Sequence, residues 1–267
     1  MVESVNTLAA LRRHIASLEG VPATKAAARI ATGHAHFDQT LHGGLAQGRV
    51  HELFGNGDDE GAVAGLSLIL AHLAAGGSPL FWLRPANGTA GQPYGPGLAA
   101  LGIDPVHLLI GAMKDEALLL RAAVDALRCP TLGALVIELR GRAPLLDLTA
   151  SRRLALAAEA SGVTTFLLRI GADPAPSAAD TRWRVKAAPS VPLPGNAPGM
   201  TAFDLSLLRR RSGPDGMTWR LVWDSDRGVF GEECDERHDR RSDSADTPLS
   251  GAVVPLPPAR PAAHRAA

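Results

Sequence analysis

The chain has 267 residues, of which 46% are hydrophobic, so it is long enough to bury the core of one large domain. Lysine and arginine balance aspartate and glutamate at 27 residues each, which excludes a protein drawn onto nucleic acid by its overall charge. Cys129 and Cys234 lack metal-ligand spacing and make no disulfide framework. With no signal peptide and no apolar membrane span evident, we expect a cytoplasmic protein without a metal or cofactor.

Residues 1–30 are predicted to form an amphipathic helix and a polar connector. Large apolar side chains recur there at helical spacing: Val5, Leu8, Leu11, Ile15 and Leu18. Two interpretations stay open for this apolar face. It binds a partner protein, through Leu8, Leu11, Ile15 and Leu18, or it packs on the chain's own domain.

Strands and helices alternate from about residue 31 onward. The apolar pattern predicts strands at 49–54, 80–83, 106–110, 134–139 and 163–170, and helices at 61–75, 97–101, 115–127 and 147–160. Strands this apolar, separated by helices, indicate a parallel sheet covered on both faces. Three later segments (181–187, 202–210 and 218–223) alternate apolar and polar residues, and residues 212–216 suit a hairpin turn. We therefore predict an α/β core over 31–231, mostly parallel, with antiparallel strands added at its C-terminal end.

Residues 232–267 are charged and then rich in proline and alanine, with almost no large apolar side chains. This composition predicts a disordered tail. Its only apolar anchor lies around Val253 and Leu256, which are candidates for binding a partner. The alternative is a plain solvated extension.

The start of the core carries the most specific motif. Residues 43–55 have the sequence Gly-Gly-Leu-Ala-Gln-Gly-Arg-Val-His-Glu-Leu-Phe-Gly, and residues 32–38 have the sequence Thr-Gly-His-Ala-His-Phe-Asp. Both resemble the segments that lead into the first core strand of the bacterial RecA family. The resemblance extends over roughly residues 30–230, although only its first thirty residues are specific. It implies a RecA-like P-loop NTPase core.

The loop after this strand lacks the residues that bind a nucleoside triphosphate. A working phosphate loop needs G-x-x-x-x-G-K-[ST], in which the lysine neutralises phosphate and the hydroxyl binds Mg²⁺. Counted from Gly55 through Gly57, Gly61 stands at the lysine position and Ala62 at the hydroxyl position. A shift by one or two residues places Ala62 or Val63 at the lysine position, so no register works.

Three carboxylates follow instead: Asp58, Asp59 and Glu60. Two like charges about 4 Å apart repel by roughly 4 kcal/mol at an effective dielectric of about 20, which opposes triphosphate binding. The same side chains suit a helix N-terminus, and we expect at least one of them to cap free N–H groups. Acidic side chains of the chain itself would then occupy the anion site, and no ATPase activity is expected.

Glu138 ends an apolar strand, where RecA-like proteins place an acid that holds Mg²⁺ through water. The alternative for Glu138 is an ion pair with Arg140 or Arg142. Four histidines lie close together in the sequence without metal-ligand periodicity, and they are expected at the surface: His34, His36, His42 and His51.

A RecA-like core without the phosphate lysine, between an N-terminal helix and a disordered tail, is similar to the ImuA family. That resemblance implies a noncatalytic accessory in damage-induced (SOS) translesion DNA synthesis and mutagenesis. It implies binding to the polymerase-like protein ImuB, to RecA or to both, with an alternative replicative-type polymerase and DNA reached indirectly.

Two other functions stay open. A SulA-like cell-division inhibitor belongs to the same wider group, although such chains are typically shorter. A RecA paralogue that binds single-stranded DNA would use the only compact basic run, Arg209, Arg210 and Arg211, which otherwise marks a solvated strand end.

Overall fold

The computed structural model describes residues 28–231, apart from 87–90, 92 and 130. The helix predicted within residues 1–30 and the tail predicted at 232–267 lie outside the described residues. So do the partner-binding candidates in them: Leu8, Leu11, Ile15, Leu18, Val253 and Leu256.

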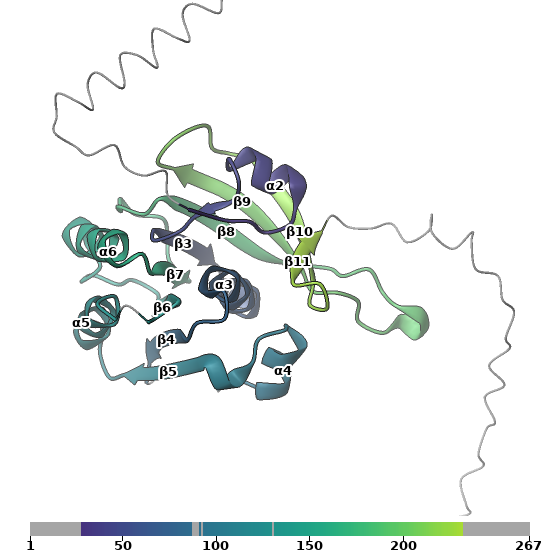
Figure 1. Cartoon of the computed structure of the whole chain (residues 1–267), viewed down its shortest axis with the longest axis horizontal. Helices are drawn as coiled ribbons and strands as arrows, with labels where there is room; N and C mark the ends of the chain where they lie inside the picture. Colours follow the sequence, from purple (N-terminus) through teal and green to yellow (C-terminus); the bar gives the residue numbers. More distant parts are fainter. Residues whose placement is uncertain (1–27, 87–90, 92, 130, 232–267) are drawn as a thin grey trace, which may run out of the picture. The chain divides into compact units, whose positions relative to one another are not determined.

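A nine-stranded sheet forms the centre of the described part of the chain (Figure 1), with the order β11-β10-β9-β8-β3-β7-β6-β4-β5. The strands from β8 to β5 are parallel, and β9, β10 and β11 continue the sheet antiparallel. This confirms the predicted α/β class. The strands are β3 Val50–Gly55, β4 Leu80–Pro85, β5 Leu108–Met113, β6 Ala134–Arg140, β7 Thr164–Ile170, β8 Thr181–Ala188, β9 Ala202–Arg210, β10 Thr218–Asp224 and β11 Val229–Gly231, and a separate pair joins β1 Arg29–Ile30 to β2 Leu45–Ala46.

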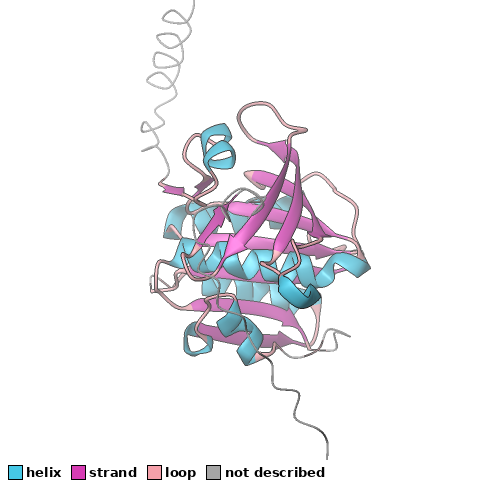
Figure 2. Ribbon diagram, turned by 90° about the vertical axis from the view of Figure 1, so that its right-hand side faces the viewer, coloured by secondary structure: helices cyan, strands magenta, loops and turns pink. Residues whose placement is uncertain are grey.

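Helices cover both faces of the sheet. On one face lie α3 Glu60–Ala75 and α4 Gly95–Ala100, and on the other lie α5 Glu116–Ala126 and α6 Leu148–Ser161 (Figure 1). Figure 2 shows the twisted strands in magenta with the helices in cyan packed against them. A short helix, α2 Ala35–Thr40, precedes the sheet.

Local sequence explains where these helices begin and end. Asp115 accepts a hydrogen bond from the N–H of Leu118 at the start of α5, and Asp147 accepts one from Ala150 at the start of α6. Both α3 and α6 end at a glycine in the left-handed region, Gly76 and Gly162.

The strand predicted at 106–110 is displaced toward the C-terminus. Asp104 caps the N–H of Val106, and Pro105 opens a short 3₁₀ helix, Pro105–His107. Strand β5 therefore starts only at Leu108, because the capped turn uses the backbone groups that the strand would need.

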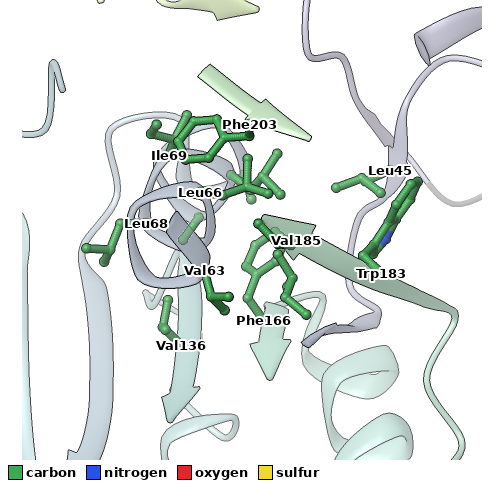
Figure 3. Packing of buried hydrophobic residues seen from close by; sticks show 14 of the residues in the cluster. Leu45, Val63, Leu66, Leu68, Ile69, Val136, Phe166, Trp183, Val185 and Phe203 are labelled. Atoms are coloured by element: carbon green, nitrogen blue, oxygen red, sulfur yellow. The ribbon is translucent and has the colours of Figure 1, made fainter. Parts of the chain in front are cut away.

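The core consists of one hydrophobic cluster on each face of the sheet. Residues of β6 alternate between them, with Val136 toward α3 and with Leu135 and Ile137 toward α5 and α6. In Figure 3, Val63 and Leu66 of α3 pack with Val136 and neighbouring side chains. Burial of both faces explains why the parallel strands are apolar along their whole length.

The expectation that all four histidines lie at the surface is wrong for His34 and His51. His34 accepts a hydrogen bond from the N–H of Phe37 through Nδ1 and caps α2. His51 lies 2.7 Å from Thr181 Oγ1 and 2.9 Å from the carbonyl oxygen of Ala46, and burial lowers its pKa. The error has a topological cause: β3 is an interior strand, so every one of its residues is buried. His36 and His42 are exposed.

Candidate functional site

The loop between β3 and α3 joins an interior parallel strand to a helix of 16 residues. Only residues 56–59 separate the strand from the helix, and Gly57–Asp59 form a 3₁₀ helix. A Cβ on Gly55 would collide with Val63, so this glycine allows α3 to pack closely on its strand. A Cβ on Gly57 or Gly61 would meet nothing within 4 Å. Those two glycines are therefore not required by packing.

The sequence predicts that one of the three acids caps α3 with its side chain. This is wrong for Asp59, which stands at the N-cap position. Its side chain makes no capping hydrogen bond. The N–H of Asp59 donates to the carbonyl oxygen of Asn56 at 3.1 Å, and the N–H of Glu60 donates to the carbonyl oxygen of Gly57. This 3₁₀ turn satisfies backbone donors that a side chain would otherwise cap.

The three acids have different surroundings. Asp59 accepts a hydrogen bond from the N–H of Ala187 at 3.0 Å, which ties the turn to β8. Asp58 is exposed to solvent. Glu60 forms a two-point ion pair with Arg140, in which Nη1 donates to Oε2 at 2.8 Å and Nη2 donates to Oε1.

Arg140 connects Glu60 to a buried carboxylate. Its Nε donates to Oε1 of Glu138 at 2.7 Å, and the other oxygen of Glu138 lies 3.7 Å from Nε of Arg84. Of the two pairings considered for Glu138, the structure thus has the one with Arg140, while Arg142 is exposed. We call the four residues Arg84, Glu138, Arg140 and Glu60 the Arg140 cluster.

Hydrogen bonds within the Arg140 cluster shift the pKa values of Glu60 and Arg140. The hydrogen bonds from Arg140 lower the pKa of the Glu60 carboxyl, and those same bonds raise the pKa of the Arg140 guanidinium. Only 2% of the Glu138 side chain is exposed, and it forms ion pairs with the two arginines beside it, Arg84 and Arg140. Arg84 also lies over the Trp82 ring, 5.1 Å from its centroid, and donates to the Gly91 carbonyl at 3.0 Å.

A second buried ionic group was missed by the sequence analysis. Glu52 in the middle of β3 accepts a hydrogen bond from the Ser177 hydroxyl at 2.9 Å and forms an ion pair with Arg182, whose Nε lies 3.1 Å from Oε2. Burial raises the pKa of Glu52, although the contacts with Ser177 and Arg182 act in the opposite direction. Burial also lowers the pKa of Arg169 on β7. The available signal was a charged residue within each of these otherwise apolar strands.

The three arginines at the end of β9, residues 209–211, have different surroundings. Arg210 donates through Nη1 to the carbonyl oxygen of Thr40 at 2.9 Å, which fixes the end of α2 against the sheet. Arg209 and Arg211 are exposed.

The described residues contain neither a cluster suited to a metal ion nor a helix suited to a membrane. These residues gather no group of three or more histidine, cysteine, aspartate or glutamate side chains that could hold a metal ion. Where helices are described, none combines the length and apolarity needed to cross a membrane.

No family model matches the chain. Two curated proteins are similar to it, each named Protein ImuA and each from a strain of Caulobacter vibrioides. Either relative is 33% identical over 190 residues, a stretch that covers 65% of this chain and 75% of the relative.

Proposed function

Because the chain belongs to the ImuA family, we propose that it is a noncatalytic accessory protein in damage-induced (SOS) translesion DNA synthesis and mutagenesis. In this proposal it binds ImuB, RecA or both, and it reaches an alternative replicative-type polymerase and DNA through ImuB. The likeness to Protein ImuA supports the role in mutagenesis.

We further propose that the core is RecA-like and has lost nucleotide binding. The mostly parallel sheet, with α3 starting directly after the interior strand β3, supports such a core. The motif at residues 43–55 supports it independently.

The Arg140 cluster is the observation that carries the noncatalytic role. A phosphate at the amino end of α3 would lie near the carboxylates of residues 58–60, and the nearby guanidinium group of Arg140 is already paired with Glu60. Neither Gly61 nor Ala62 supplies the cation or the hydroxyl that would repay this cost. A Mg²⁺ ion on Glu138 would likewise compete with two guanidinium groups for the same carboxylate.

Calorimetry tests the loss of nucleotide binding. ATP with Mg²⁺ is titrated into the full chain, with an active RecA protein as the positive control. We expect no binding heat for this chain. Micromolar affinity, or ATP hydrolysis by the purified chain, contradicts the proposal.

Partner capture tests the accessory role. The tagged full chain is recovered from DNA-damaged cells, and bound proteins are identified by mass spectrometry. ImuB or RecA is expected among them, whereas a cell-division protein in their place would favour the SulA-like alternative. Recovery of neither ImuB nor RecA contradicts the accessory role.

A further inference from the structure

Helices α5 and α6 lie next to each other on one face of the sheet (Figure 1). Their side chains leave a groove of about 480 Å³ between them. We call it the α5–α6 groove. Leu120 and Val124 contribute an apolar strip from one side of α5. Charged side chains along the same groove are Arg121, Asp125, Arg128 and Arg153.

The groove has more positive than negative side chains. Asp125 already pairs with Arg128 at 3.2 Å, one helical turn away. Arg121 and Arg153 are exposed and make no hydrogen bond or ion pair with the described residues. Three arginines against one aspartate leave a net of two positive charges, beside apolar side chains that remain partly exposed.

We propose that the α5–α6 groove binds an acidic amphipathic segment of a partner protein. Carboxylates of the segment would pair with the guanidinium groups of Arg121 and Arg153. A guanidinium group is planar and can donate two parallel hydrogen bonds to one carboxylate. Its apolar side chains would cover Leu120 and Val124. This inference rests on the proposed function, in which ImuB is a partner, and it gives that partner a place on the chain.

The lining of the groove favours a protein segment over nucleic acid. Single-stranded nucleic acid is usually bound by aromatic side chains that stack on bases, together with a basic track for the phosphates. None of the residues that line this groove is aromatic, and Asp125 would face the phosphates. An apolar strip between arginines suits a peptide with both acidic and apolar residues.

A charge-reversal pair tests the proposal with purified ImuB as the probe. The full chain is compared with the double variant Arg121→Glu and Arg153→Glu, and the dissociation constant is measured at several salt concentrations. We expect binding to weaken about tenfold or more, because the charges that attract the segment now repel it. The steepness of the salt dependence should fall as well.

A matched control keeps the same change in net charge away from the groove. Arg152 lies on α6 and Arg227 follows β10; both are exposed, and neither lines the groove. The double variant Arg152→Glu and Arg227→Glu should bind ImuB within about twofold of the unmodified chain. Equal weakening in both double variants would mean that only overall charge matters, and it overturns the proposal.

The remaining outcomes separate this inference from the function on which it rests. Failure of the unmodified chain to bind ImuB overturns the groove, and it contradicts the accessory role as well only if RecA is not captured either. Unchanged binding by the Arg121 and Arg153 variant overturns the groove alone. Loss of labelled single-stranded DNA binding with ImuB binding intact also overturns it, in favour of a nucleic-acid site. Should charge reversal unfold the chain, glutamine at both positions removes the charges without repulsion and gives the same comparison.

Discussion

The Arg140 cluster and the α5–α6 groove use arginine in opposite ways. In the Arg140 cluster, two arginines pair with Glu60 and Glu138 inside the chain, so the charges are satisfied by folding alone. In the groove, Arg121 and Arg153 are exposed and unpaired among the described residues. Removing one member of a buried ion pair destabilises the fold, whereas a charge left unpaired at the surface is available to a partner.

The largest expected effect comes from removing Arg140. Arg140→Ala leaves Glu138 buried without its closest partner, and it leaves Glu60 unpaired. The free energy of unfolding should fall by about 3 kcal/mol, as measured in urea. Arg142→Ala, at an exposed neighbour, is the control and should change it by less than about 0.5 kcal/mol. A similar loss in both variants would mean that the Arg140 cluster is not the source of the stability.

Alanine at Gly55 and at Gly61 tests which of these two glycines the packing of α3 requires. Gly55→Ala should destabilise the chain by about 1–3 kcal/mol, because the added methyl collides with Val63. Gly61→Ala has open space in the first turn of α3, so it should raise stability by about 0.5 kcal/mol. Both values come from denaturant unfolding. Destabilisation by Gly61→Ala would show that the first turn of α3 does not have room for the added methyl group.

Acid should weaken the fold through His51. Burial places the folded-state pKa of His51 below its ordinary value of 6.5, so the unfolded chain binds more protons as the pH falls. The contribution of neutral His51 to stability is therefore present above about pH 6.5 and is lost as the pH falls below it.

His51→Gln removes this titration while it keeps one donor for Ala46 and one acceptor for Thr181. Unfolding in urea between pH 5 and pH 8 should give a shallower acid slope for the variant. Parallel curves would place the acid sensitivity on other groups, such as Glu60 with its lowered pKa.

The smallest expected effect lies in the groove. Arg121→Ala or Arg153→Ala removes an exposed side chain without a partner among the described residues, so the unfolding free energy should change by less than about 0.5 kcal/mol. Thermal or urea unfolding measures this. A loss comparable with that of Arg140→Ala would mean that these arginines stabilise the fold, and the contrast between the two regions would disappear.

Most of the architecture could be predicted because it depends on local pattern. Apolar runs such as 134–139 predicted interior parallel strands, and the alternation at 202–210 and 218–223 predicted the antiparallel end of the sheet. The displaced start of β5 follows from a cap and a proline whose combined effect was underestimated. Burial of His51 was missed because a polar residue in a short strand does not reveal which strands lie on either side of it.

The sequence by itself determined the α/β class and the run of acids before Gly61 and Ala62, where neither a lysine nor a hydroxyl follows, since these depend only on residue type and spacing. Only the tertiary structure decided which residues those acids contact. Glu60 pairs with Arg140, 80 positions away, because β3 and β6 end at the same edge of one parallel sheet. Ion pairs between distant residues depend on strand order, and strand order is not a local property of the chain.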